Sequence, residues 1–293
     1  MRKWYKYWLD FEQQGVQRLS VDEDFSAHSK SMGGYKADPC CVSIQSFFSR
    51  FLQRNGVRHD CYDDFLQSHL KKNKKILSLA SGRAANEAFL FQQGYCITCS
   101  DIEVPPIFYD VQKLFPGLAY KCLDILKTPA SSRYDFIVAL SLIYLFTDVQ
   151  LKKAMTNIFQ SLQDEGGGFM LDSAGSPDNF LAFVLHDFLL PVEIHARRWF
   201  AFFRKGKLPG LVVKHHGYRR TNSDIVKIAE ESGFHISAQK DYCFLSEFRR
   251  SALLAKLLKS GSWVTRLFEK LGRSIPYVRM FYFKKSNVRR QDE

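Results

Sequence analysis

The sequence has no long hydrophobic run, no internal repeat and no low-complexity linker. Its most apolar stretch, Phe180 to Val192, is interrupted by His186 and Asp187 and is too short to cross a bilayer. The first residues, MRKWYKYWLDFEQQ, lack the apolar core of a signal peptide. We therefore expect one large or two small domains in 293 residues, in the cytoplasm, with peripheral contact to a membrane left open.

The cysteines show no disulfide-like spacing. The chain has 7 cysteines, an odd number without a disulfide-like pattern, which favours a reducing cytoplasm. The nearest candidates for a metal site lack the spacing by which two ligands converge on one ion. They are Cys40, Cys41, His59, Cys61 and His69. We predict buried or surface thiols there and no metal.

Acidic residues are fewer than basic ones. The chain has 42 Lys and Arg against 30 Asp and Glu, a formal net charge of +12. This excess predicts an anionic partner and leaves nucleic acid, a membrane surface and an acidic metabolite open. No separate RNA-binding module is visible, which argues against nucleic acid. Apolar residues make up 46% of the chain, which is ample for a core.

The stretch from Lys74 to Glu103 is the most informative part of the sequence. It combines a strand Ile76–Leu79, a small-residue turn Ala80–Ala84, a helix Ala84–Gln93 ended by Gly94, and a strand Tyr95–Ser100 followed by Asp101. A strand that feeds a helix through such a turn lets a ligand approach the backbone closely. A carboxylate at the tip of the next strand can accept both hydrogen bonds of a ribose diol. We predict a nucleoside-cofactor site at the carboxyl edge of a parallel sheet.

The motif in this stretch narrows the choice of cofactor. The glycines of a dinucleotide fingerprint and the Gly-Lys-Ser/Thr ending of a phosphate loop are both missing. Residues 76–84, ILSLASGRA, resemble motif I of the class I S-adenosylmethionine-dependent methyltransferases, hydrophobic-Leu-Asp-Leu-Gly-x-Gly-x-Gly. Ser78 replaces the acidic residue, and Ala80 and Ala84 replace two glycines. Glu87, one helical turn further, is a candidate substitute for the acid.

Later segments extend the resemblance over about residues 70–285. They are a strand Ala119–Leu123 followed by Asp124, a strand Tyr134–Leu140, a helix begun by Thr147, a strand Gly168–Asp172, a strand Phe234–Gln239 and a final strand Pro276–Lys284. The resemblance implies a three-layer αβα sandwich around a doubly wound, mostly parallel seven-stranded sheet. The implied strand order is 3-2-1-4-5-7-6, with strand 7 antiparallel. We divide the chain into residues 1–70 and a methyltransferase-like domain over 71–293.

The resemblance also implies the residues that hold S-adenosylmethionine. The methionine moiety would lie against the motif I turn, the ribose against the tip of the second strand, and the adenine after the third strand and beside the fourth. The residues so implied are Ala80, Ser81, Gly82, Glu87, Asp101, Ile102, Asp124, Ile125, Leu140 and Ser141. By this resemblance, Asp101 would bind the ribose and Asp124 would bind the adenine amino group.

Residues 1–70 are expected to form a helical lid over cofactor and substrate. Aromatic residues at Trp4, Tyr5 and Trp8 suggest an amphipathic helix at the start. Two further helices are predicted over Ser43–Arg54 and Asp60–Leu70. In the loop between the first two, Tyr35 and Lys36 could close on the methionine carboxylate, or they are plain loop residues.

A helical insertion over residues 176–215 follows the fifth strand. Pro191 is expected to break it into two helices, of which the second mixes basic and aromatic residues. Three interpretations stay open for this helix: it covers the acceptor, it lies on an anionic membrane, or it is buried with a solvated basic face. For Phe244 to Arg273 we expect a helix packed on the domain rather than a membrane anchor.

His215 and His216 lie where the family binds its acceptor, at the carboxyl rim of the sheet. A histidine there could remove a hydroxyl proton, or be an ordinary rim residue, while Arg219 and Arg220 could clamp an acidic acceptor. An Asn/Asp-Pro-Pro-Tyr motif for amino acceptors is missing. We predict O-methylation of a small-molecule, glycan or lipid-linked acceptor. A non-catalytic protein of this fold and an RNA methyltransferase are the alternatives; the oligomeric state stays open.

Overall fold

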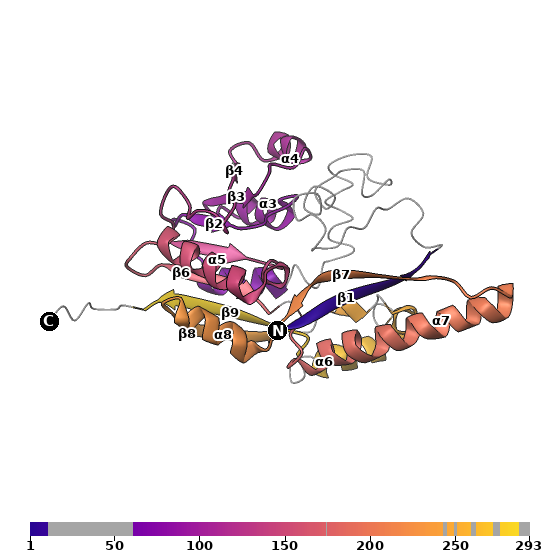
Figure 1. Ribbon diagram of the computed structural model, residues 1–293. Helices are drawn as coiled ribbons and strands as arrows, with labels where there is room; N and C mark the ends of the chain where they lie inside the picture. The colour runs from indigo at the N-terminus through magenta and orange to yellow at the C-terminus, as the bar shows by residue number, and fades with distance from the viewer. Residues whose placement is uncertain are drawn as a thin grey trace.

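A seven-stranded sheet runs through the centre of the molecule in the computed structural model (Figure 1). In spatial order its strands are β4 (Ala119–Cys122), β3 (Ile97–Asp101), β2 (Ile76–Ser78), β5 (Phe136–Ala139), β6 (Gly168–Asp172), β9 (Val278–Lys285) and β8 (Phe234–Tyr242). Neighbouring strands are parallel except at β9, which is antiparallel to both β6 and β8. The predicted order, with a reversed strand 7, is confirmed.

The structure describes residues 1–10, 61–173, 175–242, 245–248, 251–258, 262–271 and 276–286. Residues 61–69 are helical, which confirms the third helix predicted before the sheet. The second predicted helix, Ser43–Arg54, and the loop with Tyr35 and Lys36 lie outside the described residues.

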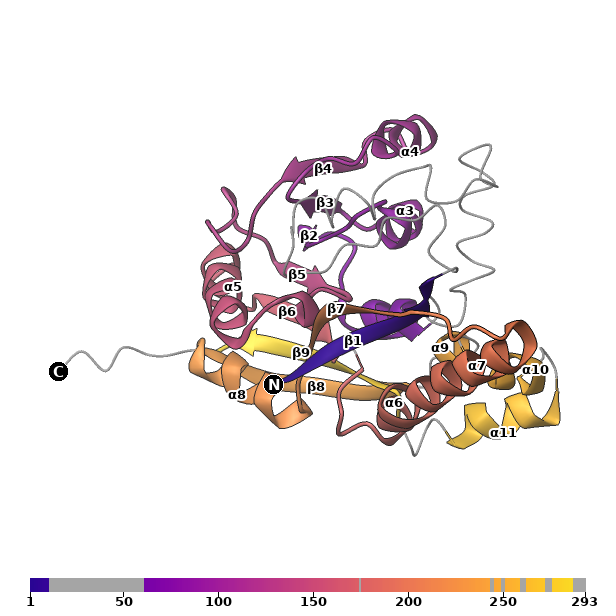
Figure 2. The same ribbon diagram turned by 45° about the vertical axis from the view of Figure 1, so that its right-hand side comes forward.

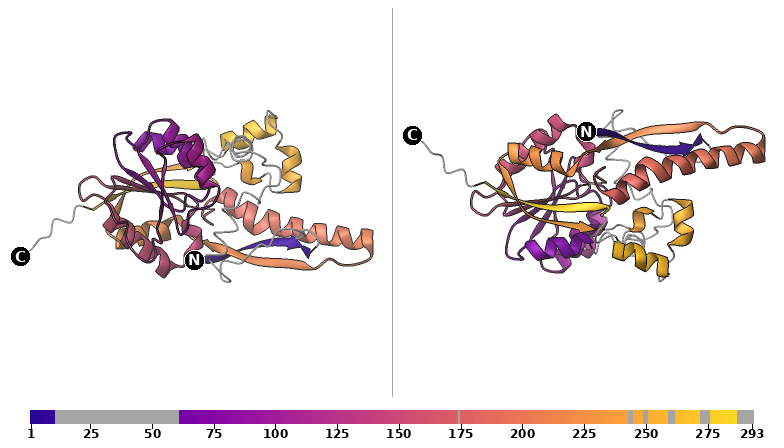
Figure 3. Two further views of the ribbon diagram at one scale, coloured as in Figure 1. Left: turned by 90° about the horizontal axis from the view of Figure 1, so that it is seen from above. Right: turned by 90° about the horizontal axis from the view of Figure 1, so that it is seen from below.

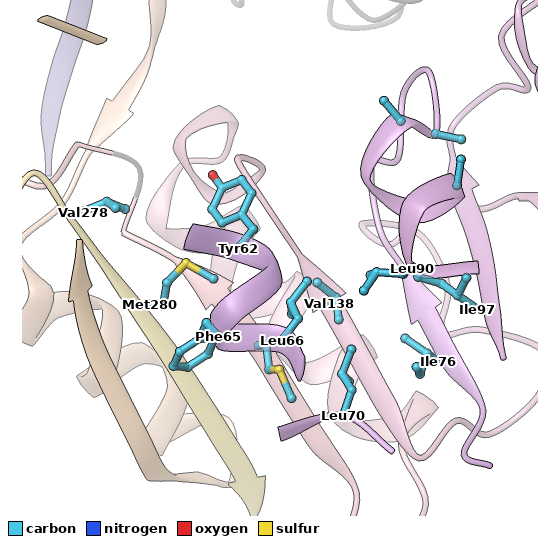
Figure 4. Close-up of a cluster of buried hydrophobic side chains, with 14 of the residues drawn as sticks. Tyr62, Phe65, Leu66, Leu70, Ile76, Leu90, Ile97, Val138, Val278 and Met280 are labelled. Atoms are coloured by element: carbon cyan, nitrogen blue, oxygen red, sulfur yellow. The ribbon is translucent and has the colours of Figure 1, made fainter. Parts of the chain in front are cut away.

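Each face of the sheet carries its own apolar core, because alternate residues of a strand point to opposite sides. Ile76 and Val138 point to the face covered by the 61–69 helix, α3 (Ala85–Gln92) and α4 (Phe108–Leu114). Leu77 and Ile137 point to the face covered by α5 (Asp148–Ser161) and α8 (Asn222–Glu231). Figure 4 shows the first core, where the 61–69 helix lies over the strands. The central strands are buried on both sides, which is why they read as continuous apolar runs in the sequence.

An arm projects beyond the carboxyl edge of the sheet (Figures 1 and 3). It consists of a two-stranded antiparallel ribbon, β1 (Arg2–Leu9) with β7 (Leu211–Arg219), and of the helical insertion. The insertion contains α6 (Phe180–Phe183), a π-helical segment η4 (Val184–Leu189) and α7 (Leu190–Lys205). Pro191 does not break the helix: it sits in the first turn of α7, where a missing N–H is tolerated, and the π-helical segment joins α6 to α7.

The predicted helix around Trp4, Tyr5 and Trp8 is wrong, because residues 2–9 form strand β1. Trp and Tyr are favoured in strands, and eight residues with this composition fit either periodicity. The deciding factor is the partner: β1 pairs with β7 in a register running from Arg2 opposite Arg219 to Leu9 opposite Leu211. The proposed lid role of residues 1–70 stays a prediction.

The segment before β9 forms three short helices where one amphipathic helix was expected. They are α9 (Leu245–Phe248), α10 (Ala252–Leu257) and α11 (Trp263–Leu271), and Figure 2 shows them beside α7. Among the described residues, no helix has the length and apolar content needed to span a membrane.

Candidate functional site

The turn after β2 has an unusual backbone. Ala80, Gly82 and Ala84 all have left-handed conformations, with φ of 51°, 51° and 56°. In motif I of the family, glycine occupies these three alternating positions. For an alanine the left-handed region costs about 1–2 kcal/mol. The chain therefore keeps the glycine-type backbone at two positions where the sequence no longer has glycine, which marks a functional constraint on this turn.

Hydrogen bonds from β3 hold this turn in place. The Ser81 N–H donates to the Ser100 carbonyl at 2.9 Å, and the Ser100 N–H donates to Ser81 Oγ at 3.2 Å. From β4, the Tyr120 hydroxyl donates to the Gly82 carbonyl at 3.0 Å. The turn is thus pinned to two neighbouring strands before any ligand binds.

Glu87 brings a carboxyl group next to Ser78, the residue at the acidic position of motif I. Both side chains are buried, and Ser78 Oγ donates to Glu87 Oε1 at 2.6 Å. Glu87 Oε2 has no hydrogen-bond partner in the described part of the chain. Burial raises the pKa of the Glu87 carboxyl above its ordinary value, and the bond from Ser78 opposes the rise. A buried acceptor without a donor points to a ligand group that donates.

Asp101 lies at the tip of β3 beside the turn. Its Oδ2 accepts the Gly82 N–H at 3.1 Å, and its Oδ1 accepts the Ile102 N–H at 2.8 Å. These two backbone bonds fix the orientation of the carboxylate. Asp101 therefore lies next to Gly82, and its predicted role toward the ribose stays a prediction.

Asp124 follows β4 and is brought to the same edge. The Leu123 N–H donates to the Asp101 carbonyl at 2.8 Å, which joins the two strand ends. Asp124 Oδ1 accepts the Leu126 N–H at 3.0 Å, and Oδ2 lies 3.2 Å from Lys127 Nζ. Ile125 is buried next to it.

Two side chains near Ser141 were missed by sequence reasoning. Ser141 has a φ of 54°, and its N–H donates to Asp172 Oδ1 at 2.6 Å. The Tyr62 hydroxyl donates to Asp172 Oδ2 at 2.8 Å and lies 3.0 Å from Ser141 Oγ. Asp172 ends the fifth predicted strand, so its place on the carboxyl edge was the available signal. Leu140 is half-buried, and the Leu79 N–H donates to the Val138 carbonyl at 2.8 Å, which joins the ends of β2 and β5.

The two predicted catalytic histidines have different surroundings on β7. His215 is buried, and its Nε2 lies 2.7 Å from the Gly217 carbonyl. His216 is the extra residue of a β-bulge, because Trp4 pairs with Gly217 and Tyr5 pairs with His215. Bulges next to active sites redirect a side chain. Here the bulge places the His216 ring 4.9 Å from Trp4, measured between ring centroids.

An aromatic group surrounds His216 at the junction of the arm and the sandwich. The ring of Tyr144, which lies in the 3₁₀ helix η3 (Ile143–Leu145) after β5, is 5.1 Å from that of His216. On the other side, the Trp4 ring lies 4.7 Å from His186, whose Nε2 is 2.8 Å from the Tyr277 hydroxyl. Residues from β1, η3, η4 and β7 therefore meet at the carboxyl edge of the sheet.

A cavity of about 350 Å³ opens beside this group, between β1 and α7. Its lining includes Trp4 of β1, His186, and Glu193 and Arg197 of α7. Aromatic and charged side chains therefore line it together, which suits a ligand with an apolar body and a polar group.

Arg219 and Arg220 have internal partners. Arg219 donates to the Gly175 carbonyl at 2.7 Å and to Asp187 Oδ2 at 2.6 Å. Arg220 donates to Asp148 Oδ1 at 2.6 Å and to the carbonyls of Ile143 and Phe146. These contacts bind β7 to the sandwich, and we therefore do not assign the predicted acidic-acceptor clamp to Arg220.

The candidate thiols and imidazoles near the start of the chain are only partly described. Cys40, Cys41 and His59 lie outside the described residues. Cys61 forms no disulfide with another described residue, and the His69 ring packs 4.8 Å from both Phe65 and Tyr282. Within the described ranges, no group of three or more His, Cys, Asp or Glu side chains is arranged to hold a metal ion.

Comparisons with known proteins give structural matches alone. No protein-family profile and no curated protein sequence matches the chain. The PH0226 protein from Pyrococcus horikoshii OT3 is 14% identical, covers 86% of this chain and 98% of its own, and has a TM-score of 0.51. The pyocyanin biosynthetic protein PhzM is 13% identical, covers 90% of this chain and 62% of its own, and has a TM-score of 0.51.

A third match is the magnesium protoporphyrin IX methyltransferase ChlM from Synechocystis PCC 6803 with bound SAH, 13% identical over 84% of this chain and 88% of its own, with a TM-score of 0.48. At these identities the matches concern the fold. The strand order with the reversed β9, taken with the two matches at a TM-score of 0.51, shows that the chain has the fold of the class I S-adenosylmethionine-dependent methyltransferases.

Proposed function

We propose that the protein is an S-adenosylmethionine-dependent methyltransferase that acts on a hydroxyl group of a small-molecule, glycan or lipid-linked acceptor. The observation that carries the proposal is the buried Glu87 carboxylate beside the left-handed turn, with Oε2 unpartnered within the described residues. An ammonium group is the donor that suits a buried carboxylate oxygen, and the methionine moiety of the cofactor carries one. We place the protein in the cytoplasm, because its cysteines show no disulfide-like spacing.

The residues present fit this cofactor. The backbone of Ala80, Ser81 and Gly82 would face the methionine moiety, with Glu87 accepting from its ammonium group. Asp101, held by the Gly82 and Ile102 N–H groups, would bind the ribose diol, and Asp124 would bind the adenine amino group. When bound, the cofactor supplies an electrophilic methyl group on sulfur. The task of the chain is then to position the acceptor and to take up its proton.

His216 is the candidate base. The imidazole is the side chain that exchanges a proton near neutral pH, and the bulge directs it into the aromatic group at the carboxyl edge. His215 is the weaker candidate, because its Nε2 is engaged by the Gly217 carbonyl. The acceptor would lie against the aromatic group that Trp4, Tyr144 and His216 form, its hydroxyl proton passing to the His216 ring as the methyl group is transferred.

Calorimetric titration with S-adenosylmethionine and S-adenosylhomocysteine tests the cofactor site. We expect Asp101→Ala to lose binding, because the carboxylate is the group assigned to the ribose. Glu165→Gln is the matched control: it removes a carboxylate from an exposed turn at the opposite edge of the sheet and should bind as the wild type does. Absence of binding by the folded wild-type chain would favour a non-catalytic protein that kept this fold.

An RNA methyltransferase is the second candidate, and the net charge of +12 is the observation that favours it. RNA binding of this origin weakens steeply with salt, since it depends on release of counterions from phosphates. A hydroxyl acceptor of low molecular weight requires no such affinity. Filter binding of a mixed-sequence RNA over a series of salt concentrations separates the two.

A further inference from the structure

The helical insertion carries an exposed apolar stripe. Phe188, Val192, Trp199 and Phe203 are exposed by 59%, 53%, 54% and 79%, although all four are large and apolar. Their spacing of four, seven and four residues places them on one face of the helix that runs from η4 into α7. The opposite face holds Ile194, the buried residue of α7, which lines the cavity against β1. The stripe therefore faces away from the protein.

Basic residues accompany the stripe along α7 and just beyond it. Arg197, Arg204, Lys205 and Lys207 are exposed. The acidic residue of α7, Glu193, accepts a hydrogen bond from Ser251 Oγ at 2.5 Å. The helix thus combines an aromatic face with a strong excess of positive charge, and Figure 3 shows that it lies on the projecting arm.

A second helix with the same character lies nearby. In α11, Trp263 and Leu267 are exposed, and so are Arg266 and Lys270. The bond between Ser251 and Glu193 ties the start of α10 to α7, so this helical group adjoins the arm (Figure 2). Two neighbouring helices therefore present tryptophan together with lysine and arginine to solvent.

We infer that α7 docks in the plane of an anionic lipid surface through this stripe. Trp and Phe on one helix face, with Lys and Arg on the rest of the helix, is the composition that binds the headgroup boundary of a bilayer. Neither helix is long and apolar enough to span, so each would lie on the surface. The charge argues against a second copy, since two chains of net charge +12 would place basic helices against each other, and the exposed aromatic face favours lipid over nucleic acid. The inference goes beyond the proposed methyl transfer and does not depend on it.

Co-sedimentation of the full chain with vesicles tests the inference. We expect binding to vesicles of phosphatidylcholine mixed with phosphatidylglycerol, weak binding to phosphatidylcholine alone, and release as salt is raised. The double variant Trp199→Ser, Phe203→Ser should lose at least about tenfold in affinity, because two large apolar side chains no longer enter the interface. The control Tyr109→Ser, Val149→Ser removes two exposed apolar residues from α4 and α5 and should bind as the wild type does.

Three results would overturn the inference. One is wild-type protein that stays in the supernatant with phosphatidylglycerol vesicles. Another is a stripe variant that sediments as fully as the wild type. The third is a dimer in analytical ultracentrifugation that the stripe variant abolishes, which would assign the stripe to a second copy of the chain. Thermal unfolding and S-adenosylmethionine titration of each variant report folding and the cofactor site separately, so a failure of one proposal is distinguishable from a failure of the other.

Discussion

Replacing Glu87 by glutamine should stabilise the free protein and weaken its cofactor site. Burying the charged carboxyl of Glu87, with Oε2 unpartnered among the described residues, costs about 1–3 kcal/mol in lost hydration. In Glu87→Gln the amide Nε2 stands in the place of Oε2 and is also unpartnered, so the gain comes from the lost charge. Glutamine keeps the shape and an oxygen for Ser78 but removes the charge. We expect the free energy of unfolding at neutral pH to rise by roughly 1–3 kcal/mol, at about 2–4 °C of thermal midpoint per kcal/mol.

The pH dependence follows from the direction of the pKa shift. Burial raises the folded-state pKa of Glu87 above its unfolded value of about 4.3. Over the window between the two values the folded chain holds the proton and the unfolded chain releases it, so stability falls as pH rises. Glu87→Gln lacks this group. The advantage of the variant should therefore be absent below about pH 4 and grow through that window.

Cofactor affinity should change in the opposite sense. A hydrogen bond to a charged group contributes about 1.5–3 kcal/mol, so its loss should raise the Kd for S-adenosylmethionine by roughly 10–150-fold. Scanning calorimetry over a pH series and isothermal titration at neutral pH measure the two effects, with Glu165→Gln as control. A Glu87→Gln protein that bound the cofactor as tightly as the wild type, or was less stable at every pH, would refute the assignment.

Three further substitutions test strand β7. His216→Gln should reduce turnover of a hydroxyl acceptor by about 10²–10⁴-fold and leave cofactor affinity unchanged. His215→Gln should act mainly on stability. Equal turnover in wild type and His216→Gln would exclude His216 as the base. Gly217→Ala should destabilise the fold by about 1–3 kcal/mol in urea unfolding, because its Cβ would lie 2.3 Å from the Tyr144 carbonyl oxygen. An unchanged urea midpoint of unfolding would show that β7 does not approach Tyr144 so closely.

Much of the sandwich could be predicted, because its strands are recognisable from the local sequence pattern. The runs around Ile76, Ile137 and Met170 are apolar on both faces, and the turns between them are marked by glycine and capping residues. The ribbon of the arm was not predictable in this way. Strand β1 is specified by its pairing with β7, and no property of residues 2–9 alone selects strand over helix.

The site residues also divide into those that the local sequence locates and those that depend on contacts distant in sequence. Asp101 and Asp124 follow strand ends and could be located from spacing. The left-handed backbone at Ala80 and Ala84 could not, because alanine carries no local preference for it. Tyr62 and Asp172 form their bond 110 residues apart, and the separate roles of His215 and His216 depend on a bulge that exists only in the paired ribbon.

The pairing of strand β1 with strand β7 has a consequence for folding. Strand β1 is made before β7 and cannot complete its pairing until Arg219 has been added. Contacts of such long sequence separation form late, since closing the loop costs entropy before the contact is gained. Trp4 therefore reaches His216 after the central strands β2 to β6 can already have formed, and the cavity between β1 and α7 closes after them. During folding, the carboxyl edge around Gly82 and Asp101 can thus be assembled while the arm is still open.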